Sequence, residues 1–500
     1  MNVLLVNPQS YFQRKALNAV TMPDIPLNLA CIAAALEGDG HVVRILDINI
    51  IKTKSDLVNR LSEMRWDIIG FTGTTSVILN CYHAIRVIKR VARQAKVVLG
   101  GWHASAIPVR TMNECPEIDF IVKGEGELTI KELVRAIALG GDISMILGIV
   151  YRDGRGNVIE NKERPLMANL DDLPFPALHL LPMDEYRKIG FNTIGGYFKK
   201  DLYISAISTS RGCTGKCTFC ADHVINHHTC RFRSPEKVVA ELKRAIKQYK
   251  VRIFFFMDAH FTMSPVRAKK ICELIIKEGL HIKWACQARV DSVSPELLGL
   301  MKMAGCTRIG YGIESGSPKV LKIMKKGTSI AQMKDAIRWT KKAGIMAVIY
   351  LLYGMPGESI DDVKLTRQLL LQLKPDYVNQ TIAIPYPGTE LREQAIRERL
   401  INDDRWEFYN YPFGNVLEYP GIEKVFRTQA KVLINYILSP GYVWKTFKTI
   451  RSIYHLSFYF KVAQVLILGI FMLNLAREAD VKKFLANLST RENRKPGDSS

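Results

Sequence analysis

Three closely spaced cysteines are the residues of this chain whose spacing points most directly to chemistry. The segment Arg211–Cys220 reads Arg-Gly-Cys-Thr-Gly-Lys-Cys-Thr-Phe-Cys, so Cys213, Cys217 and Cys220 follow a C-x3-C-x2-C pattern. Cysteine thiolates are the usual ligands of iron–sulfur clusters. A loop with three of them can bind three irons of a [4Fe–4S] cube and leave the fourth iron open to a bound molecule. A structural zinc site is the alternative, and its fourth ligand could come from His223, His227, His228 or Cys230.

The start of the chain and the other cysteines indicate a reducing compartment. Met1–Pro8 has no basic n-region, and its apolar run is too short for a secretory signal. We therefore expect a cytoplasmic protein, in which cysteines do not form disulfides. The scattered cysteines are expected to be small buried residues: Cys31, Cys81, Cys115, Cys230, Cys272, Cys286 and Cys306.

The composition is that of a folded protein with more than one domain. A length of 500 residues exceeds the usual size of one core. A hydrophobic content of 48% and a charged content of 24% exclude a disordered chain. The formal net charge of +22 favours an anionic partner, either nucleic acid or a membrane, unless the surface is simply basic throughout.

The first 145 residues alternate short apolar runs with helical stretches such as Leu27–Gly38 and Leu79–Gln94. Five runs rich in Val, Ile and Phe are predicted to be buried parallel strands: Val3–Val6, Val42–Leu46, Ile68–Phe71, Val97–Leu99 and Phe120–Val122. This alternation predicts a doubly wound, Rossmann-like α/β domain, which binds ligands at the carboxyl ends of its strands.

Small residues follow three of these strands, in the segments Thr72–Ser76, Gly100–Ser105 and Gly124–Glu127. Glycine lets the backbone approach a ligand closely, and a hydroxyl side chain such as that of Thr72 can bond its polar groups. The sequence therefore predicts a ligand site at this edge of the domain.

A proline-containing segment, residues 146–200, is predicted to be an ordered linker, after which the alternation restarts. Six further strands are expected: Tyr203–Ser208, Arg252–Met257, Ile282–Gln287, Arg308–Gly312, Ala347–Tyr353 and Asp376–Ala383. Three intervening helices open with a capping serine before proline, at Ser234, Ser264 and Ser294. Residues 201–395 are thus predicted to form a partial (β/α)6 barrel with its site at the carboxyl ends of the strands.

Residues 396–500 are expected to form a helical tail. Tyr442–Arg451 interleaves aromatic and basic residues, and Val462–Ala476 is an apolar run of 15 residues. That run is shorter than the roughly 20 residues needed to span a bilayer. It is expected to be a core helix or, alternatively, part of a basic amphipathic segment on a membrane surface.

The cysteine loop, with Phe219 before its last cysteine, follows the first strand of the predicted barrel and resembles the signature of the radical S-adenosylmethionine (SAM) superfamily. The resemblance implies that the open iron chelates the amino and carboxylate groups of SAM. It further implies that an electron splits SAM into methionine and a 5′-deoxyadenosyl radical, which takes a hydrogen atom from the substrate. An electron donor such as ferredoxin or flavodoxin is then required.

Later segments resemble the supporting motifs of the same superfamily. The implied SAM-binding residues are Asp258, Gln287, Arg289, Glu314, Ser315 and Gly354, beside Phe219 in the cysteine loop. The resemblance implies that the strand end at Asp258 approaches the SAM amino nitrogen and that Arg289 meets its carboxylate. Glu314 is implied to contact the ribose or the methionine part, and Gly354 to lie close to the adenine.

The first domain resembles the cobalamin-binding module of one large branch of this superfamily. The resemblance is carried by Gly100–Ser105, Lys123–Glu127 and Leu170–Ala177. The implied cobalamin contacts are Thr72, Gly100, Gly101, His103, Ser105, Gly124 and Glu125. The region Asn7–Tyr11 lacks the histidine that ligates cobalt in many cobalamin proteins. We therefore expect cobalamin without a histidine ligand, with His103 either lining the pocket for the nucleotide tail or serving as an ordinary buried histidine.

These features together predict a cobalamin-dependent radical SAM enzyme that methylates an unactivated carbon. Alternatives are ring or carbon–carbon bond formation on a lipid or tetrapyrrole, modification of RNA, and a non-catalytic cobalamin or redox sensor. The basic aromatic tail favours a lipid-like substrate and peripheral association with the inner face of a membrane. Nucleic acid is disfavoured as a partner because no RNA-binding appendage is recognisable.

Overall fold

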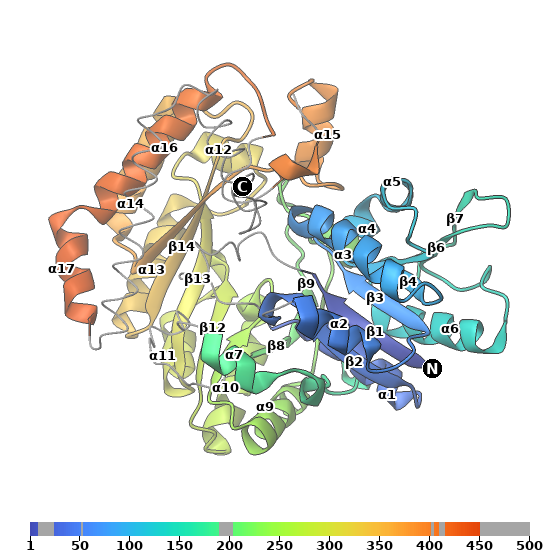
Figure 1. The fold of residues 1–500 in the computed structure, drawn as a ribbon. Helices are drawn as coiled ribbons and strands as arrows, with labels where there is room; N and C mark the ends of the chain where they lie inside the picture. Colours follow the sequence, from blue (N-terminus) through green and yellow to red (C-terminus); the bar gives the residue numbers. More distant parts are fainter. Residues whose placement is uncertain (9–24, 52–53, 190–203, 402–404, 410–415, 451–500) are drawn as a thin grey trace, which may run out of the picture. The chain divides into compact units, whose positions relative to one another are not determined.

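The computed structural model describes residues 1–8, 25–51, 54–189, 204–401, 405–409 and 416–450. Two compact units are present, Met1–Phe426 and Arg427–Ser500. The first unit contains two large sheets with their helices (Figure 1).

The first sheet has the strand order β2-β1-β3-β4-β5-β6-β7. Its parallel strands confirm all five predictions: β1 (Asn2–Asn7), β2 (Val42–Asp47), β3 (Ile68–Thr72), β4 (Lys96–Gly100) and β5 (Phe120–Val122). Its helices are α1 (Leu27–Gly38), α2 (Lys54–Ser62), α3 (Ile78–Val91), α4 (Trp102–Ala106), α5 (Pro108–Glu114) and α6 (Gly126–Leu139). The order reverses between β1 and β3, and ligands of such sheets bind at the carboxyl ends of the strands beside that point.

The predicted linker contains structure of its own. Its hairpin of β6 (Ile149–Arg152) and β7 (Val158–Glu160) pairs antiparallel with β5 and so extends the first sheet beyond residue 145. Further along, the Asp171 carboxylate accepts a hydrogen bond from the Ser234 backbone N–H at 3.1 Å, and Ala177 N–H donates to the Ala30 carbonyl. The linker ends in α7 (Met183–Ile189). The described part of the linker thus contacts both α1 and the start of α9 (Pro235–Tyr249).

The second sheet is an open parallel sheet with the order β15-β14-β13-β12-β11-β8. All six predicted strands are present: β8 (Ile204–Ile207), β11 (Ile253–Phe256), β12 (Lys283–Ala288), β13 (Cys306–Glu314), β14 (Met346–Tyr353) and β15 (Tyr377–Ile382). Figure 1 shows helices along one face of this sheet: α9 (Pro235–Tyr249), α10 (Pro265–Lys277), α11 (Pro295–Met303), α13 (Ile330–Lys342) and α14 (Ile360–Leu373). β8 and β15 remain at the two edges, so the predicted partial barrel is confirmed.

The three predicted serine caps begin helices of this barrel. The hydroxyl groups of Ser234, Ser264 and Ser294 each accept a hydrogen bond from a backbone N–H in the first turn, at 3.2, 3.4 and 3.2 Å. Each cap satisfies an N–H group that has no partner within the helix. Because each helix follows the loop that leaves the carboxyl end of a strand, the cap also fixes where that loop ends.

The chain after the barrel is helical in its described part. It contains α15 (Glu390–Arg397), α16 (Ile422–Ile437) and α17 (Pro440–Thr449). The predicted apolar run Val462–Ala476 lies outside the described residues. Among the residues that are described, no helix has the length and apolar character needed to cross a membrane.

Candidate active site and cofactor-binding residues

A short hairpin closes the cysteine loop at its base. β9 (Ser210–Gly212) pairs antiparallel with β10 (Cys230–Phe232), so all three cysteines lie in the loop of residues 213–229 between them. Gly212 has φ +88°, and a Cβ there would lie 2.1 Å from the Thr229 carbonyl oxygen. Only glycine fits this position. The loop therefore starts from a fixed point one residue before Cys213.

The side chains of Cys213 and Cys217 lie close to Gly215. A Cβ on Gly215 would lie 3.3 Å from Cys213 Sγ and 3.9 Å from Cys217 Sγ, and the Gly215 N–H donates to Cys213 Sγ at 3.3 Å. Backbone N–H groups bonded to sulfur are among the features that tune a cluster. The glycine thus leaves the room that a cluster beside these thiolates would need.

The rest of the loop is anchored to the barrel. Thr218 N–H donates to the Met324 carbonyl at 3.1 Å, and its own carbonyl accepts from Leu391 N–H at 2.8 Å. Phe219 packs against an apolar cluster that includes Leu352 and Met355. Phe219 thus anchors the loop through apolar contacts, while Cys220 stays exposed.

The geometry does not favour the zinc alternative. Among the described residues, no three His, Cys, Asp or Glu side chains converge as a single metal ion requires. In a cube each thiolate binds a different iron, so its ligands need not converge on one point. Two of the four candidate fourth ligands are also engaged elsewhere: both ring nitrogens of His223 lie against carbonyl oxygens of Cys220 and Gly388, and His228 Nδ1 lies 2.9 Å from the Gly215 carbonyl oxygen. The loop fits a [4Fe–4S] cluster better than zinc.

Two cations stand beside the cysteine loop. Arg289 Nη1 lies 3.9 Å from the position of a Cβ on Gly215, and its Nη2 donates to the Lys326 carbonyl at 3.0 Å. Burial raises the pKa of the Cys217 thiol, while Lys326 and Arg289 oppose this rise. Arg289 is held by Asp291 through Nε and Nη2, at 3.0 and 2.8 Å. Its Nη1, the atom near Gly215, takes part in none of these hydrogen bonds.

Glu314 reaches the same place through an unusual backbone. It has φ +62°, at an irregularity in the pairing of β13 with β14. Its Oε1 accepts a hydrogen bond from Lys326 Nζ at 2.8 Å. Glu314 and Lys326 are each 8% exposed. Burial alone would lower the pKa of Lys326, but the Glu314 carboxylate raises it. A left-handed non-glycine residue at a strand end is a feature of functional sites.

Ser315 lies apart from this ion pair. Its hydroxyl is fully buried and lies 3.2 Å from Thr366 Oγ1 of α14. The next residue, Gly316, packs so closely on α14 that a Cβ would lie 2.6 Å from Thr366 Cα. Ser315 and Gly316 therefore anchor the strand end to α14.

Asp258 is directed at the backbone before the cysteine loop. Its carboxylate accepts from Thr209 N–H, Thr209 Oγ1 and Ser210 Oγ, each at 2.8 Å. Asp258 is 1% exposed. Its side chain thus holds the chain that leads into β9. Gln287 is half-buried in β12, one strand further along.

Gly354 follows β14 in a tight turn closed by Glu358. Glu358 Oε2 accepts from the backbone N–H groups of Gly354 and Met355 at 2.5 and 3.3 Å. Burial raises the pKa of Glu358 to about 7. Gly354 has φ +86°, and a Cβ there would lie 2.7 Å from Phe426. The strand end predicted to meet adenine is therefore a compact turn with one carboxyl group that titrates near neutrality.

The predicted contacts of the first domain come together at one edge of its sheet. Gly73 N–H donates to the Gly100 carbonyl at 3.0 Å, and Ser105 Oγ accepts from Gly124 N–H at 3.0 Å. Thr72 Oγ1 accepts from Asn28 Nδ2 at 2.9 Å. A Cβ on Gly101, which has φ +98°, would lie 2.8 Å from the Gly73 carbonyl oxygen. The loops after β3, β4 and β5 thus meet through backbone and small side chains.

His103 is buried at this edge. Its Nδ1 lies 3.1 Å from Thr75 Oγ1, and its ring packs edge-on against Trp406 with centroids 4.8 Å apart. Burial, with Arg110 and Arg392, lowers the pKa of His103 to about 3, so the ring is neutral. Nε2 is buried and has no hydrogen-bond partner among the described residues. An unpaired buried nitrogen beside a glycine cradle fits a residue that completes its hydrogen bonds on a bound cobalamin tail.

Glu125, by contrast, faces the hairpin of the cysteine loop. Its Oε1 lies 2.7 Å from Arg211 Nη1, and its Oε2 lies 2.7 Å from Arg231 Nη1. Glu127 also pairs with Arg211. The structure thus brings the predicted cobalamin contacts together except for Glu125, which turns toward the iron–sulfur site.

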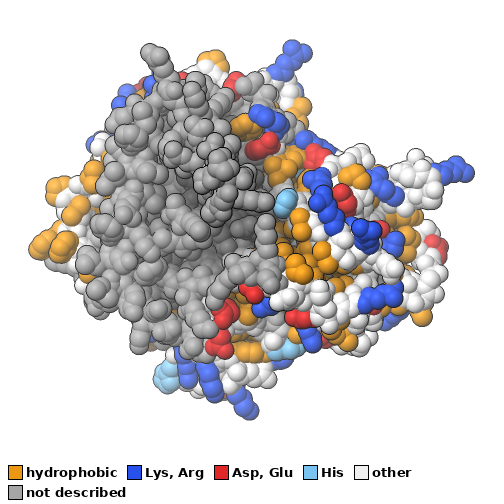
Figure 2. Space-filling view, viewed as in Figure 1, with side chains coloured by type: hydrophobic (Ala, Val, Ile, Leu, Met, Phe, Trp, Pro, Cys, Tyr) orange, Lys and Arg blue, Asp and Glu red, His pale blue; other side chains and the backbone are white. Residues whose placement is uncertain are grey.

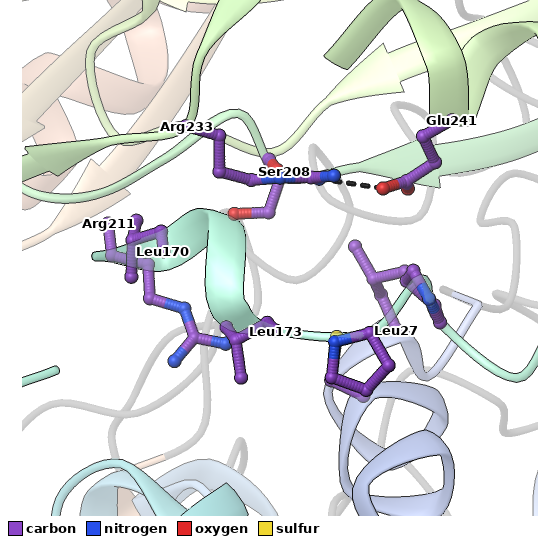
Figure 3. A pocket seen from close by; sticks show the side chains of 10 residues that line it. Leu27, Leu170, Leu173, Ser208, Arg211, Arg233 and Glu241 are labelled. Atoms are coloured by element: carbon purple, nitrogen blue, oxygen red, sulfur yellow. Dashed lines mark hydrogen bonds and ion pairs between the residues drawn. The ribbon is translucent and has the colours of Figure 1, made fainter. Parts of the chain in front are cut away.

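Arg211 also lines a small pocket between α1, the linker and the end of β8 (Figure 3). Its walls include the apolar side chains of Leu27 and Leu173. Its lining also includes the ion pair of Arg233 Nη1 with Glu241 Oε2 at 2.7 Å, drawn as a dashed line in Figure 3. None of the three cysteines of the loop lines this pocket. It belongs to the packing of the linker on the barrel.

Several site residues were missed in the sequence. Lys326 stands in Met324-Lys-Lys-Gly327, where nothing distinguishes it from the many other lysines. His260 and Thr262 both contact Ser292 Oγ, at 2.7 and 2.6 Å, behind Arg289. Only Arg211 carried a signal, because it stands two residues before Cys213.

Comparison with known proteins assigns the family. Residues 207–370 match the radical SAM superfamily, and residues 15–134 match the B12 binding domain. An uncharacterized methyltransferase of Pyrococcus horikoshii is 35% identical over 443 residues, which cover 88% of this chain and 93% of that protein. An anaerobic magnesium-protoporphyrin IX monomethyl ester cyclase of Rubrivivax gelatinosus is 28% identical over 418 residues, or 82% of this chain and 72% of that protein.

A solved structure shares the fold over most of both chains. The radical SAM methyltransferase TsrM from Kitasatospora setae, with cobalamin and a [4Fe–4S] cluster bound, has a TM-score of 0.69. The match covers 88% of this chain and 89% of that chain, at 19% identity. The chain belongs to the cobalamin-dependent radical SAM enzymes, whose cofactors are a [4Fe–4S] cluster, SAM and cobalamin.

Proposed function

We propose that the chain transfers a methyl group to an unactivated carbon of a hydrophobic, lipid-like substrate. The observation that carries this proposal is the presence of both candidate cofactor sites, the cysteine loop and the first-domain edge, in one compact unit. The similarity to a methyltransferase over nearly the whole of both chains supports it. When bound, the cluster and SAM supply a radical that activates the substrate, and cobalamin carries the methyl group.

The residues of the barrel edge have the chemistry to orient SAM. Arg289 Nη1, which takes no part in the pairing with Asp291, can bond a carboxylate, and the buried Lys326–Glu314 pair supplies one positive and one negative charge. Cys213, Cys217 and Cys220 are assigned to the cluster. Thr72, Gly100, Gly101, His103, Ser105 and Gly124 are assigned to cobalamin.

A hydrophobic substrate is supported by the second unit. Leu438, Trp444 and Phe447 of its described part are 62%, 64% and 68% exposed. Exposed aromatic side chains in a segment whose sequence also contains lysines favour a membrane surface. On the face drawn in Figure 2, the Lys and Arg side chains of the described residues lie among apolar and neutral ones. We propose a cytoplasmic enzyme that associates peripherally with anionic membranes.

The first test is anaerobic reconstitution with iron, sulfide, hydroxocobalamin and reductant, followed by incubation with trideuteromethyl-SAM and a lipid extract. Methyl transfer predicts formation of 5′-deoxyadenosine and a product that carries a deuterated methyl group. The similarity to a cyclase favours ring formation as the second candidate, which predicts a product that has lost two hydrogens instead. Absence of 5′-deoxyadenosine would contradict both reactions.

The membrane assignment has a separate test. The full chain should sediment with anionic liposomes, and a variant truncated near residue 440 should sediment less. Equal sedimentation of both variants, or of neither, would remove the tail from the proposal.

A further inference from the structure

Two glutamates of the first domain contact the hairpin that carries the cysteine loop. Glu125 precedes α6 and Glu127 lies in its first turn. Glu125 Oε1 and Oε2 lie 2.7 Å from Arg211 Nη1 and Arg231 Nη1, and Glu127 holds both terminal nitrogens of Arg211. We call these four side chains the carboxylate clamp.

The clamp offsets a like-charge pair built into the hairpin. Arg211 and Arg231 are direct partners in the antiparallel register of β9 and β10. Like charges directly opposite one another destabilise such a pair of strands. Glu125 bridges the two guanidinium groups, and Glu127 supplies the second negative charge. The hairpin therefore depends on carboxylates from another domain for its charge balance.

The clamp is largely removed from solvent. Glu127 is 5% exposed, and the side chains of Glu125 and Arg231 are 10% and 13% exposed. Burial alone would raise the pKa of Glu125, but Arg231 and Arg211 hold it below its usual value. Removal of one partner of a buried ion pair leaves an uncompensated charge, which is strongly destabilising. The clamp is thus sensitive to loss of a single charge.

The clamp connects the two cofactor sites through a short path. Gly124, beside Glu125, donates its N–H to Ser105 Oγ at the edge assigned to cobalamin. Arg211 stands two residues before Cys213. The linker joins the same network, because Met167 N–H donates to Glu125 Oε2 and its carbonyl accepts from Arg231 Nη1, both at 3.0 Å.

We propose that Glu125 and Glu127 are positioning residues, which hold the cysteine loop in place from the first domain and do not bind cobalamin. This inference rests on the assignment of the cluster to the three cysteines and is independent of the substrate. In this role the cobalamin-binding domain becomes part of the support of the iron–sulfur site. Loss of either carboxylate alters the surroundings of the cluster and leaves the cobalamin edge in place.

The test compares Glu125→Gln and Glu127→Gln with Glu132→Gln. Glu132 is the matched control, because it lies on α6 and pairs with Arg164 away from the cysteine loop. Each reconstituted protein is analysed without substrate for the electron paramagnetic resonance spectrum of its reduced cluster, for iron release to a chelator and for retained cobalamin. We expect a changed spectrum and iron release on the order of tenfold faster in the two clamp variants, as loss of a charge-assisted hydrogen bond predicts. Cobalamin should be retained in all three proteins.

Two outcomes would overturn the inference. The first is a spectrum and an iron-release rate in both clamp variants that equal those of Glu132→Gln. The second is loss of cobalamin with an unchanged cluster, which would return Glu125 to the cobalamin site. If Glu127→Gln does not fold, Arg211→Lys keeps the charge and removes the paired geometry, and an unchanged spectrum there would equally overturn the inference. Since no substrate is present, a failed search for a methylated product leaves these readouts unaffected.

Discussion

The carboxyl edges of the two sheets differ in the chemical groups that they present. At the edge of the first sheet, backbone groups and small side chains meet, as where Gly73 N–H donates to the Gly100 carbonyl, and the His103 ring is neutral. At the edge of the barrel, the buried pair of Glu314 with Lys326 and the pair of Arg289 with Asp291 bring four charges close to the cysteines. The difference matches the proposed ligands. SAM has a charged amino acid end that charged side chains can orient, whereas a cobalamin tail needs room and a few hydrogen bonds.

The largest expected effect is loss of the cluster at the barrel edge with no change at the edge of the first sheet. Replacement of Cys213, Cys217 or Cys220 by alanine should abolish the cluster and SAM cleavage, while cobalamin binding persists. Iron content, the visible spectrum and 5′-deoxyadenosine formation measure the loss, and retained cobalamin measures the first domain. Cys230→Ala is the control, because Cys230 lies in β10 outside the loop. Retention of the cluster in all three loop variants would contradict the ligand assignment.

The second prediction concerns the charges of the barrel edge. Lys326→Met should leave the Glu314 carboxylate buried without its partner and lower the free energy of unfolding by about 3–5 kcal/mol. The double variant Glu314→Gln/Lys326→Met should recover most of that stability but not SAM cleavage. Denaturant unfolding and 5′-deoxyadenosine formation give the two readouts.

The neighbouring lysine provides the control for this cycle. Lys325 pairs with Glu390 at 2.6 Å, and its side chain is 54% exposed. Lys325→Met should change stability by less than about 1 kcal/mol, because exposed ion pairs contribute little. If the double variant cleaves SAM at the rate of the unmodified protein, Glu314 and Lys326 take no part in the use of SAM.

The third prediction uses pH to distinguish the edges. Burial raises the pKa of Glu358 from 4.5 to about 7, so the folded protein resists its ionisation. Its contribution to stability is complete below about pH 4.5 and is lost as the pH rises through about 7, a change of about 3 kcal/mol. The stability of Glu358→Gln should not fall in this way. Denaturant unfolding of the unmodified protein and of Glu358→Gln at pH 5 and pH 8 would measure the difference. Parallel pH profiles of the two proteins would show that Glu358 does not titrate in this range.

The first edge should behave differently in the same experiment. His103 has its pKa lowered by burial to about 3, so its neutral form contributes stability above the usual histidine pKa of 6.5. That contribution is lost progressively as the pH falls from about 6.5 toward 3. Cobalamin retention should accordingly stay constant between pH 7 and pH 8.

The smallest predicted effect comes from one methyl group at the first edge. Gly101→Ala places a Cβ 2.8 Å from the Gly73 carbonyl oxygen at φ +98°, which should lower stability by about 1–3 kcal/mol. Cobalamin retention should fall while the cluster spectrum is unchanged. Gly40→Ala is the control, because Gly40 also has a positive φ, +80°, but no neighbour within 4 Å. Equal cobalamin retention in both variants would show that the close approach at Gly101 does not affect binding of the cobalamin nucleotide tail.

Local patterns in the sequence were sufficient to predict most of the fold. The eleven parallel strands follow from short apolar runs, and the starts of three barrel helices follow from Ser-Pro pairs. The hairpin of β6 and β7 was missed because its strands are short and only partly buried, with no clear alternation.

The charged part of the site was beyond prediction for a different reason. The pairing of Glu314 with Lys326 depends on a left-handed residue at an irregular strand end, which no local pattern indicates. The contact of Glu127 with Arg211 joins residues 84 positions apart, so only the docking of two domains reveals it. The same docking places the Glu125 carboxylate against Arg211 and Arg231, which its motif did not indicate.

The sequence separation within the carboxylate clamp has a consequence for biosynthesis. Glu125 and Glu127 leave the ribosome 86 and 84 residues ahead of Arg211. Translation at about 5–20 residues per second makes this interval roughly 4–17 s. The first domain can therefore fold before the cysteine loop emerges, and the nascent hairpin meets carboxylates that are already in place. Folding in this order follows the direction of translation: the hairpin of the cysteine loop packs on a first domain that was translated before it.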